Sequence, residues 1–306
     1  MHLTRLGLIG FGEVGGILGQ GLTGAGLTTV GVWDRWLAPE APQDRRSQML
    51  QRAQMAGHTA HPGMAALCAA SDFLISAVTA SNTLAVAQEA AAHLLPGTVF
   101  LDLNSASPGT KQQAAQAVEA AGGVYVEAGV MTSVPPYGIR VPMLLGGPQA
   151  AALAPVLQGW GMDVKVVSEQ LGVASAIKMC RSVMIKGLEA LVIESYTTAR
   201  AYGVEDQVLP TLAETFPGID WEAQGSYFFS RVIQHGQRRA EEMRESARTV
   251  HEAGFAPWMT AAIADKQQWV ADQAVQGVFT NLPRQAPWRD AADRLIQARP
   301  APDALT

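Results

Sequence analysis

With 306 residues, the chain is long enough for two domains that each bury a core of their own. A hydrophobic content of 48% and a charged content of 16% are ordinary for a globular protein, and a formal net charge of −5 argues against nucleic acid or an anionic membrane as a partner. No apolar run reaches the roughly 18 residues of a membrane span, no secretory signal pattern stands at the start, and the two cysteines are too few for a disulfide framework, so we expect a cytoplasmic protein.

Short β-rich runs alternate with Ala-rich helical runs over the first 168 residues. The predicted strands are Leu6–Ile9, Thr29–Trp33, Phe73–Ala77, Val99–Leu103, Val124–Glu127, Pro142–Leu145 and Val164–Val167. The predicted helices between them are Glu13–Gly24, Ser81–His93, Gly109–Ala121 and Gln149–Trp160. This alternation is typical of βαβ units with a parallel sheet. It predicts a Rossmann-type, doubly wound α/β domain over residues 1–168.

The strand signals stop after Ser168. Residues 171–202 have the pattern of one long, mostly apolar helix that ends near Gly203, a plausible C-cap. Prolines and glycines then separate several further helical stretches. The sequence therefore predicts an all-α domain over residues 169–306, which the long helix joins to the first domain.

A glycine-rich stretch, LGLIGFGEVGG, follows the first predicted strand and opens a helix. Gly10 permits a tight turn, Gly12 lets the backbone approach a pyrophosphate, and Gly15 lets the helix pack on the strand. The helix N-terminus adds N–H donors and the positive end of its dipole. The expected cofactor-binding positions of this loop are Gly10, Phe11, Gly12, Glu13, Val14 and Gly15. The alternative is that the glycines only close a strand–helix turn.

Asp34 ends the second predicted strand, where an acid accepts hydrogen bonds from the adenosine ribose and repels a 2′-phosphate. The neighbouring Arg35 favours the opposite, because a guanidinium pairs with that phosphate. Both NAD and NADP therefore stay open, with NAD favoured. Val78 and Thr79, which follow the predicted strand Phe73–Ala77, are further expected cofactor contacts.

Lys178 stands in an apolar segment, GVASAIKMCRS, near the start of the long predicted helix. At the helical period it shares a narrow polar stripe with Ser175, Arg181, Ser182 and Glu189. A solvated helix face is the plain interpretation of such a stripe. A lysine partly desolvated between two domains would instead have a depressed pKa, which suits proton transfer. The narrowness and shortness of the stripe favour this second interpretation.

The chain resembles the β-hydroxyacid dehydrogenase superfamily, which includes 3-hydroxyisobutyrate, tartronate semialdehyde and 6-phosphogluconate dehydrogenases. Three motifs carry the resemblance in the same order: GFGEVG, LDLNSASPG at 101–109, and GVASAIK at the start of the long helix. The resemblance implies an NAD(P)-dependent dehydrogenase in which Lys178 is the general acid/base on the substrate hydroxyl. It also implies that Asn104 and Ser105 belong to a loop shared by substrate and cofactor, and that Arg238, or its neighbour Arg239, lies against the nicotinamide.

Two segments depart from the family pattern. The family's D-x-P-V-S-G-G segment corresponds here to EAGVMTSVPPYG, so Met131 replaces its serine, and Ser182 stands where an asparagine is usual. The expected substrate positions are Ser105, Met131, Thr132, Ser133, Arg181 and Ser182. Met131 adds bulk, and Arg181 beside Ser182 adds a positive charge. These changes favour a larger or differently charged substrate than 3-hydroxyisobutyrate. We expect Arg181 and Arg238 to hold a substrate anion, in a branch whose helical domain diverges from the better-known members.

Other functions stay open on the sequence alone. An imine reductase has the same fold, although many carry another residue in place of the lysine, and an intact glycine loop beside an altered substrate loop also fits an NAD(P)-binding sensor without turnover. An oxidative decarboxylase is disfavoured because Ile185 replaces its acid. No metal site is predicted, since His58 and His61 lack nearby ligands and are expected in exposed loops. The long apolar helix and the family pattern predict a homodimer that acts on a small-molecule substrate.

Overall fold

The structure, a computed structural model, describes residues 3–299. The chain has two compact units, Met1–Cys180 (the first unit) and Arg181–Thr306 (the second unit). The long predicted helix is present as α7 (Val173–Tyr202), which begins in the first unit and continues into the second. The predicted domain boundary at residues 168 and 169 lies at the end of the last strand, twelve residues before the division between the two units. Residues 300–306 of the predicted second domain lie outside the described residues.

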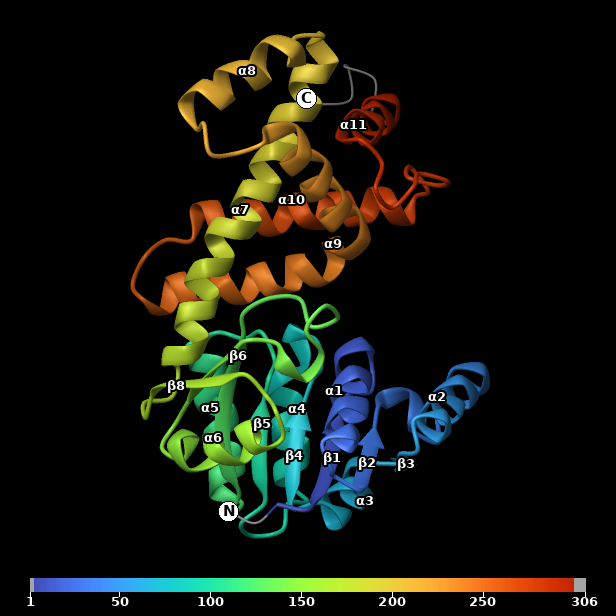
Figure 1. Cartoon of the computed structure of the whole chain (residues 1–306), viewed down its shortest axis with the longest axis vertical. Coiled ribbons are helices and arrows are strands. Elements are labelled where there is room, and N and C mark those ends of the chain that lie inside the picture. Colours follow the sequence, from blue (N-terminus) through green and yellow to red (C-terminus); the bar gives the residue numbers. More distant parts are fainter. Residues whose placement is uncertain (1–2, 300–306) are drawn as a thin grey trace. The chain divides into compact units, whose positions relative to one another are not determined.

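Strands and helices alternate in the first unit, as the sequence predicts (Figure 1). The strands are β1 (Arg5–Ile9), β2 (Thr29–Trp33), β3 (Thr59–Ala60), β4 (Phe73–Ser76), β5 (Val99–Asp102), β6 (Val124–Val130), β7 (Met143–Gly146) and β8 (Val164–Ser168). The helices are α1 (Glu13–Gly24), α2 (Gln43–Met55), α3 (Met64–Ala70), α4 (Thr83–Ala91), α5 (Pro108–Ala120) and α6 (Ala150–Gly159). The elements α2, β3 and α3 are absent from the sequence prediction.

Within residues 3–299 the strands form one eight-stranded sheet in the order β3-β2-β1-β4-β5-β6-β7-β8. The winding of the chain reverses between β1 and β4, and open α/β sheets bind ligands at such a switch point. One pair departs from the predicted parallel sheet, because β6 and β7 are antiparallel. The link between them holds only a 3-10 turn at Gly138–Arg140, whereas a parallel pair needs a longer crossover, usually a helix.

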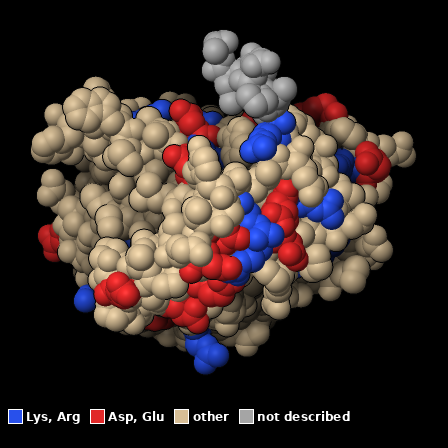
Figure 2. Space-filling model, turned by 90° about the horizontal axis from the view of Figure 1, so that it is seen from above, with Lys and Arg blue, Asp and Glu red and all other residues tan. Residues whose placement is uncertain are grey.

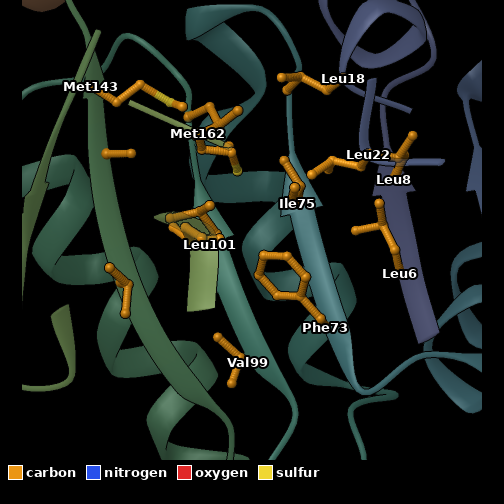
Figure 3. Packing of buried hydrophobic residues seen from close by; sticks show 14 of the residues in the cluster. Leu6, Leu8, Leu18, Leu22, Phe73, Ile75, Val99, Leu101, Met143 and Met162 are labelled. Carbon is orange, nitrogen blue, oxygen red and sulfur yellow. The ribbon is translucent and has the colours of Figure 1, made fainter. Parts of the chain in front are cut away.

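Hydrophobic side chains cover both faces of the sheet. Leu18 and Leu22 of α1 pack with Ile75 on one face, as Figure 3 shows. Residues of α3, α4 and α5 cover the other face, where Phe100 and Tyr125 stack with ring centroids 5.9 Å apart. Because strand side chains alternate between two covered faces, β4 is buried along its whole length. Each fully buried large apolar side chain contributes about 1.5–3 kcal/mol.

His58 and His61 are not exposed loop residues, so that expectation is wrong. His58 is 6% exposed, and its ring lies edge-on to Phe11 with centroids 5.8 Å apart. Burial lowers the pKa of both histidines. The unforeseen α2 and β3 flank His58 and place it against α1. Across residues 3–299, no group of three or more His, Cys, Asp and Glu side chains could hold a metal ion.

The second unit is helical, as predicted, over its described residues 181–299. After α7 come α8 (Glu205–Thr215), α9 (Trp221–Glu252), α10 (Trp258–Val275) and α11 (Trp288–Gln297). Its core is aromatic: Tyr196 and Trp288 pack with ring centroids 4.7 Å apart, and Phe229 joins them. None of the helices within residues 3–299 is both long enough and apolar enough to cross a membrane.

Ion pairs link the helices of the second unit near its surface. Arg200 of α7 binds Glu205 and Asp293, and Arg289 binds Glu222. Figure 2 shows acidic and basic side chains next to one another on the face that it displays. An exposed pair such as Arg289 with Glu222 contributes at most about 1 kcal/mol, less than the burial of one large aromatic side chain in the core.

Candidate functional site

The glycine loop after β1 has the geometry that a dinucleotide requires. Gly10 has a φ of +88°, a backbone conformation that favours glycine, and it turns the chain from β1 into α1. A Cβ on Gly15 would lie 2.0 Å from the Gly10 carbonyl oxygen, so only glycine fits there. Gly12 is the N-cap of α1, and a Cβ on it would meet nothing within 4 Å. The backbone is therefore open to close approach by a phosphate at a helix N-terminus.

Asp34 joins the end of β2 to this loop. Its Oδ2 accepts a hydrogen bond from the Phe11 N–H at 2.9 Å, and its Oδ1 accepts one from the Trp36 N–H at 3.1 Å. The Arg35 guanidinium lies over the Trp36 ring, 4.5 Å from the centroid. Each carboxylate oxygen has more than one lone pair, so Asp34 keeps acceptor capacity for ribose hydroxyls. The two residues that bear on the choice of cofactor thus lie together beside the loop.

Arg52 of α2, which is absent from the residues predicted from the sequence, also contacts the glycine loop. Its Nη2 donates to the Gly12 carbonyl oxygen at 2.8 Å, and its guanidinium lies 5.1 Å from the centroid of the Phe11 ring. A Cβ on Gly16 would lie 2.4 Å from the same Nη2. A positive charge therefore lies beside the anion-binding end of α1. The extra glycine after the motif, Gly16, is the one signal in the sequence that points to it.

Asn104 ties the carboxyl ends of two neighbouring strands together. Its Oδ1 accepts from the Val78 N–H at 2.7 Å, and its Nδ2 donates to Ser76 Oγ at 2.9 Å. Its own N–H donates to Asp102 Oδ1 at 2.9 Å. Because Asn104 is 3% exposed and its amide is used in these bonds, its observed role is to fix the loops after β4 and β5. Ser105 follows it and is half-buried.

Asp102, which is absent from the residues predicted from the sequence, is the centre of a buried network. Lys111 Nζ lies 2.9 Å from Asp102 Oδ1 and donates to the Asp102 carbonyl oxygen at 3.0 Å. The Tyr125 hydroxyl donates to Asp102 Oδ2 at 2.6 Å. Burial, and then the negative charge of Asp102, raise the pKa of Tyr125 well above its ordinary value, so the phenol stays a donor. In the sequence, the sign of this network is Lys111, a lysine within the Ala-rich helix α5.

Lys178 lies in the second turn of α7, against the end of β6. A Cβ on Gly129 would lie 3.1 Å from the Ala174 carbonyl oxygen and 3.5 Å from Lys178 Cβ. Since β1, β4, β5 and β6 are parallel, their carboxyl ends share one edge of the sheet. Gly129 is the second-to-last residue of β6. The half-buried Lys178, which lies against Gly129, is therefore at the sheet edge that also carries Gly10 and Asn104.

The other predicted positions of the first unit are at the same edge. Met131 follows β6, and its N–H donates to the Pro142 carbonyl oxygen at 2.9 Å. Thr132 is exposed and Ser133 is half-buried. Thr79 follows β4, and its Oγ1 accepts from Asn82 Nδ2 at 2.7 Å. The first unit therefore brings the predicted cofactor loops and the predicted catalytic lysine to one side of its sheet.

The remaining predicted residues belong to the second unit. Ser182 is buried, and its Oγ accepts from Lys186 Nζ at 3.2 Å. Lys186 in turn pairs with Glu242 Oε2 at 2.8 Å. Glu242 also pairs with Arg238 Nη1 at 2.7 Å, while Arg181 is exposed. Arg238 thus has an acidic partner on its own helix, a contact that its position four residues before Glu242 allows.

Two family models match the chain. The NAD binding domain of 6-phosphogluconate dehydrogenase matches residues 5–168, which is more than half of the 306 residues. The chain belongs to the β-hydroxyacid dehydrogenase superfamily. A domain of unknown function (DUF1932) matches residues 199–270, within the helical second unit of this superfamily member.

Solved structures are similar to this chain over 89–97% of its length. A conserved hypothetical protein from Sinorhizobium meliloti 1021 is 35% identical, with 97% of each chain covered and a TM-score of 0.74. The conserved protein MTH1747, described as structurally similar to 3-hydroxyacid dehydrogenases, is 30% identical over 89% of this chain and 99% of that chain, with a TM-score of 0.66. A Mycobacterium tuberculosis 3-hydroxyisobutyrate dehydrogenase, solved with L-serine, shares the fold at 17% identity, over 96% and 99% of the two chains, with a TM-score of 0.70.

Proposed function

We propose that this β-hydroxyacid dehydrogenase homologue is an NAD(P)-dependent enzyme that interconverts an alcohol and a carbonyl on a hydroxyacid-like or other anionic small molecule. The observation that carries the proposal is the place of Lys178, next to Gly129, at the sheet edge that holds the glycine loop. The bound nicotinamide supplies the hydride chemistry. Lys178 takes the proton of the substrate hydroxyl during oxidation and returns it during reduction.

The test compares wild type with Lys178→Ala in cofactor reduction at alkaline pH. The substrates are 2- and 3-hydroxyacids, aryl alcohols and sugar-derived alcohols, each with NAD and with NADP. Lys165→Ala is the matched control, because Lys165 is an exposed lysine of β8 in the same unit. We expect kcat to fall by about 10²–10⁴ in Lys178→Ala and to be unchanged in the control. Undiminished turnover in Lys178→Ala would contradict the assignment.

The same panel separates the alternative functions. Reduction of cyclic imines without oxidation of any alcohol would favour an imine reductase. Cofactor binding without turnover of any compound would favour a sensor.

For the cofactor, we propose NAD over NADP because Asp34 presents a carboxylate beside the loop. The contacts of Asp34 with the Phe11 and Trp36 N–H groups keep this charge at the end of β2. A 2′-phosphate there meets the negative charge of Asp34, although Arg35 offsets part of it. The check is the ratio of kcat/KM for NAD and NADP. We expect about tenfold preference for NAD, lost in Asp34→Ala and enlarged in Arg35→Ala.

For the substrate, we propose that Arg181, together with Arg238, binds an anionic group. Arg181 is exposed, and Arg238 keeps further N–H donors besides the one bonded to Glu242. Arg181→Ala is expected to raise KM about tenfold for every active acid while kcat changes little. An unchanged KM for all active substrates would remove Arg181 from the site.

We also propose that the protein is a homodimer through the helices of its second unit. Met184 and Leu191 of α7 are 66% and 55% exposed, and they lie on one side of the helix because they are seven residues apart. Large apolar side chains at such positions suit a protein partner. Light scattering after gel filtration is expected to give twice the mass of the chain, and Leu191→Glu is expected to give a monomer.

For the location, we propose the cytoplasm. The two cysteines, Cys68 and Cys180, are both free. Free thiols fit a reducing compartment.

A further inference from the structure

Glu127 of β6 is a buried carboxylate with partners far along the chain. It is 0% exposed. Its Oε1 accepts hydrogen bonds from the Gly172 N–H at 2.8 Å and the Ala174 N–H at 3.1 Å. Its Oε2 accepts one from the Ser175 hydroxyl at 2.6 Å. All three donors belong to the first turn of α7 or to the residue just before the helix.

The same face of β6 reaches the next turn of α7. Side chains on a strand alternate, so Glu127 and Gly129 point to the same side. Gly129 faces the Ala174 carbonyl oxygen and the Cβ of Lys178, at the distances given above. Glu127 therefore holds the start of α7, and Gly129 leaves room for the turn that carries Lys178.

The surroundings are built to hold the Glu127 carboxylate. Gly146 of β7 is its partner in the sheet register, and a Cβ on Gly146 would lie 2.5 Å from Glu127 Oε1. The first N–H groups of a helix have no partner within the helix, and a negative charge there is also favoured by the helix dipole. Glu127 thus caps α7 from another element of the fold.

We propose that Glu127 is a positioning residue for Lys178, on which the proposed function rests. By binding the first turn of α7, Glu127 fixes the rotation and the axial position of the helix against β6. A slip of α7 by one residue would turn Lys178 by about 100° and shift it by about 1.5 Å. A misplacement of about 1 Å can lower a rate about 10²-fold, so the hold on α7 matters for kcat.

The kinetic test compares Glu127→Ala and Glu127→Gln with Asp72→Ala. Asp72 is a matched control in the same unit: its Oδ1 accepts from the N–H groups of Thr4 and Arg5, each at 3.0 Å, at the start of β1. Both alanine variants lose a carboxylate that accepts two backbone N–H bonds, so we expect similar falls in Tm. We expect kcat to fall about 10²-fold in Glu127→Ala and to be unchanged in Asp72→Ala, with the cofactor Kd within twofold throughout.

The glutamine variant tests the hydrogen bonds themselves. Its amide oxygen can still accept from the N–H groups of Gly172 and Ala174, so Glu127→Gln is expected to restore kcat to within about tenfold of wild type. Ser175→Ala removes the 2.6 Å bond to Glu127 Oε2 and the 3.2 Å contact of the same hydroxyl with the Gly172 carbonyl oxygen, and it keeps both backbone bonds to Glu127 Oε1. It serves if Glu127→Ala does not fold, with an expected fall in kcat of about fivefold. A kcat in Glu127→Ala equal to that of Asp72→Ala, or a wild-type kcat in Ser175→Ala, would overturn the proposal.

A second readout does not need turnover. The chain has five lysines, so ¹³C-dimethylation gives a simple NMR spectrum in which Lys178→Arg assigns the Lys178 signal. We expect Glu127→Ala to move or broaden the Lys178 signal and to leave those of Lys165 and Lys266 in place. A moved signal without any alcohol turnover would support the positioning and contradict the proposed function. If turnover depends on Lys178 but Glu127→Ala leaves kcat and the Lys178 signal unchanged, the proposed function is supported and the positioning role of Glu127 is contradicted.

Discussion

The two units bury their charges in different ways. In the first unit, the buried carboxylates of Asp102 and Glu127 bind backbone N–H groups and hydroxyls at the edge of the sheet, and only Asp102 also binds a cation. In the second unit, Glu189 and Glu242 bind arginine and lysine side chains of facing helices or of the same helix. Unpaired backbone N–H groups occur where helices and strands end, and these ends gather at the edge of a sheet. Long helices offer few such groups, so buried acids between them need side-chain partners.

Removing Asp102 is expected to have the largest effect on stability. Asp102→Ala leaves the buried Lys111 without its carboxylate and Tyr125 without its acceptor. Removing one partner of a buried ion pair lowers the free energy of unfolding by about 3–5 kcal/mol. Urea unfolding should show this loss, while Asp163→Ala, an exposed acid of the same unit, should cost less than about 0.5 kcal/mol. Hydrogen exchange should increase in the loops after β4 and β5; an increase confined to the second unit would contradict the role assigned to Asp102.

Removing Arg239 tests the second unit in the same way. Arg239 binds the buried Glu189 through Nε at 2.8 Å and also through Nη2. Arg239→Met is expected to cost about 3 kcal/mol, because Glu189 keeps a hydrogen bond from Gln267 Nε2 at 3.3 Å. The matched control is Arg244→Met, an exposed arginine of the same helix. Adding Glu189→Leu should recover much of the loss, since no charge is then buried alone; a further loss would show that the carboxylate has another role.

Asp72 gives a smaller effect that depends on pH. Burial opposes ionisation of Asp72, but hydrogen bonds from the N–H groups of Arg5 and Thr4 and from their side chains outweigh it and lower its pKa from 3.8. A carboxyl group with a lowered folded-state pKa adds stability above its unfolded pKa, and this is lost as the pH falls through the folded-state pKa. The advantage of wild type over Asp72→Asn in urea unfolding should therefore be full above pH 5 and shrink below pH 4. A constant difference would contradict this account.

The two cysteines give the mildest test, one of reactivity. Burial, and then the charge of Glu89, raise the pKa of Cys68 to about 11, whereas Cys180 is exposed. A thiol reagent at pH 8 is expected to label one thiol per folded chain within minutes and two in urea. Cys180→Ser should leave the folded chain almost unlabelled. Fast labelling of that variant would show that the core around α3 opens readily.

Local patterns in the sequence were enough for much of this protein. The period of the strands and helices predicted the Rossmann-type unit and the helical unit, and the spacing of Gly10, Gly12 and Gly15 predicted the turn at Gly10. The elements α2, β3 and α3 were missed because α2 buries only Ala53, while β3 with two residues and α3 with seven are too short to show a clear period. Lys178 was noticeable because a lysine is rare in an apolar helical segment.

The tertiary structure decided the contacts that hold the site together. Arg52 with Gly12, Lys111 and Tyr125 with Asp102, and Glu127 with the start of α7 join residues between nine and 48 positions apart. Periodicity and motif spacing report on neighbours along the chain, so they are blind to pairings that arise only when strands and helices meet at the sheet edge. The antiparallel direction of β7 was also not predicted, because strand direction depends on how the connection from β6 folds back in space. Local sequence patterns thus specify most of the elements and the places of the glycine loop and Lys178, whereas the fold specifies which side chains hold them.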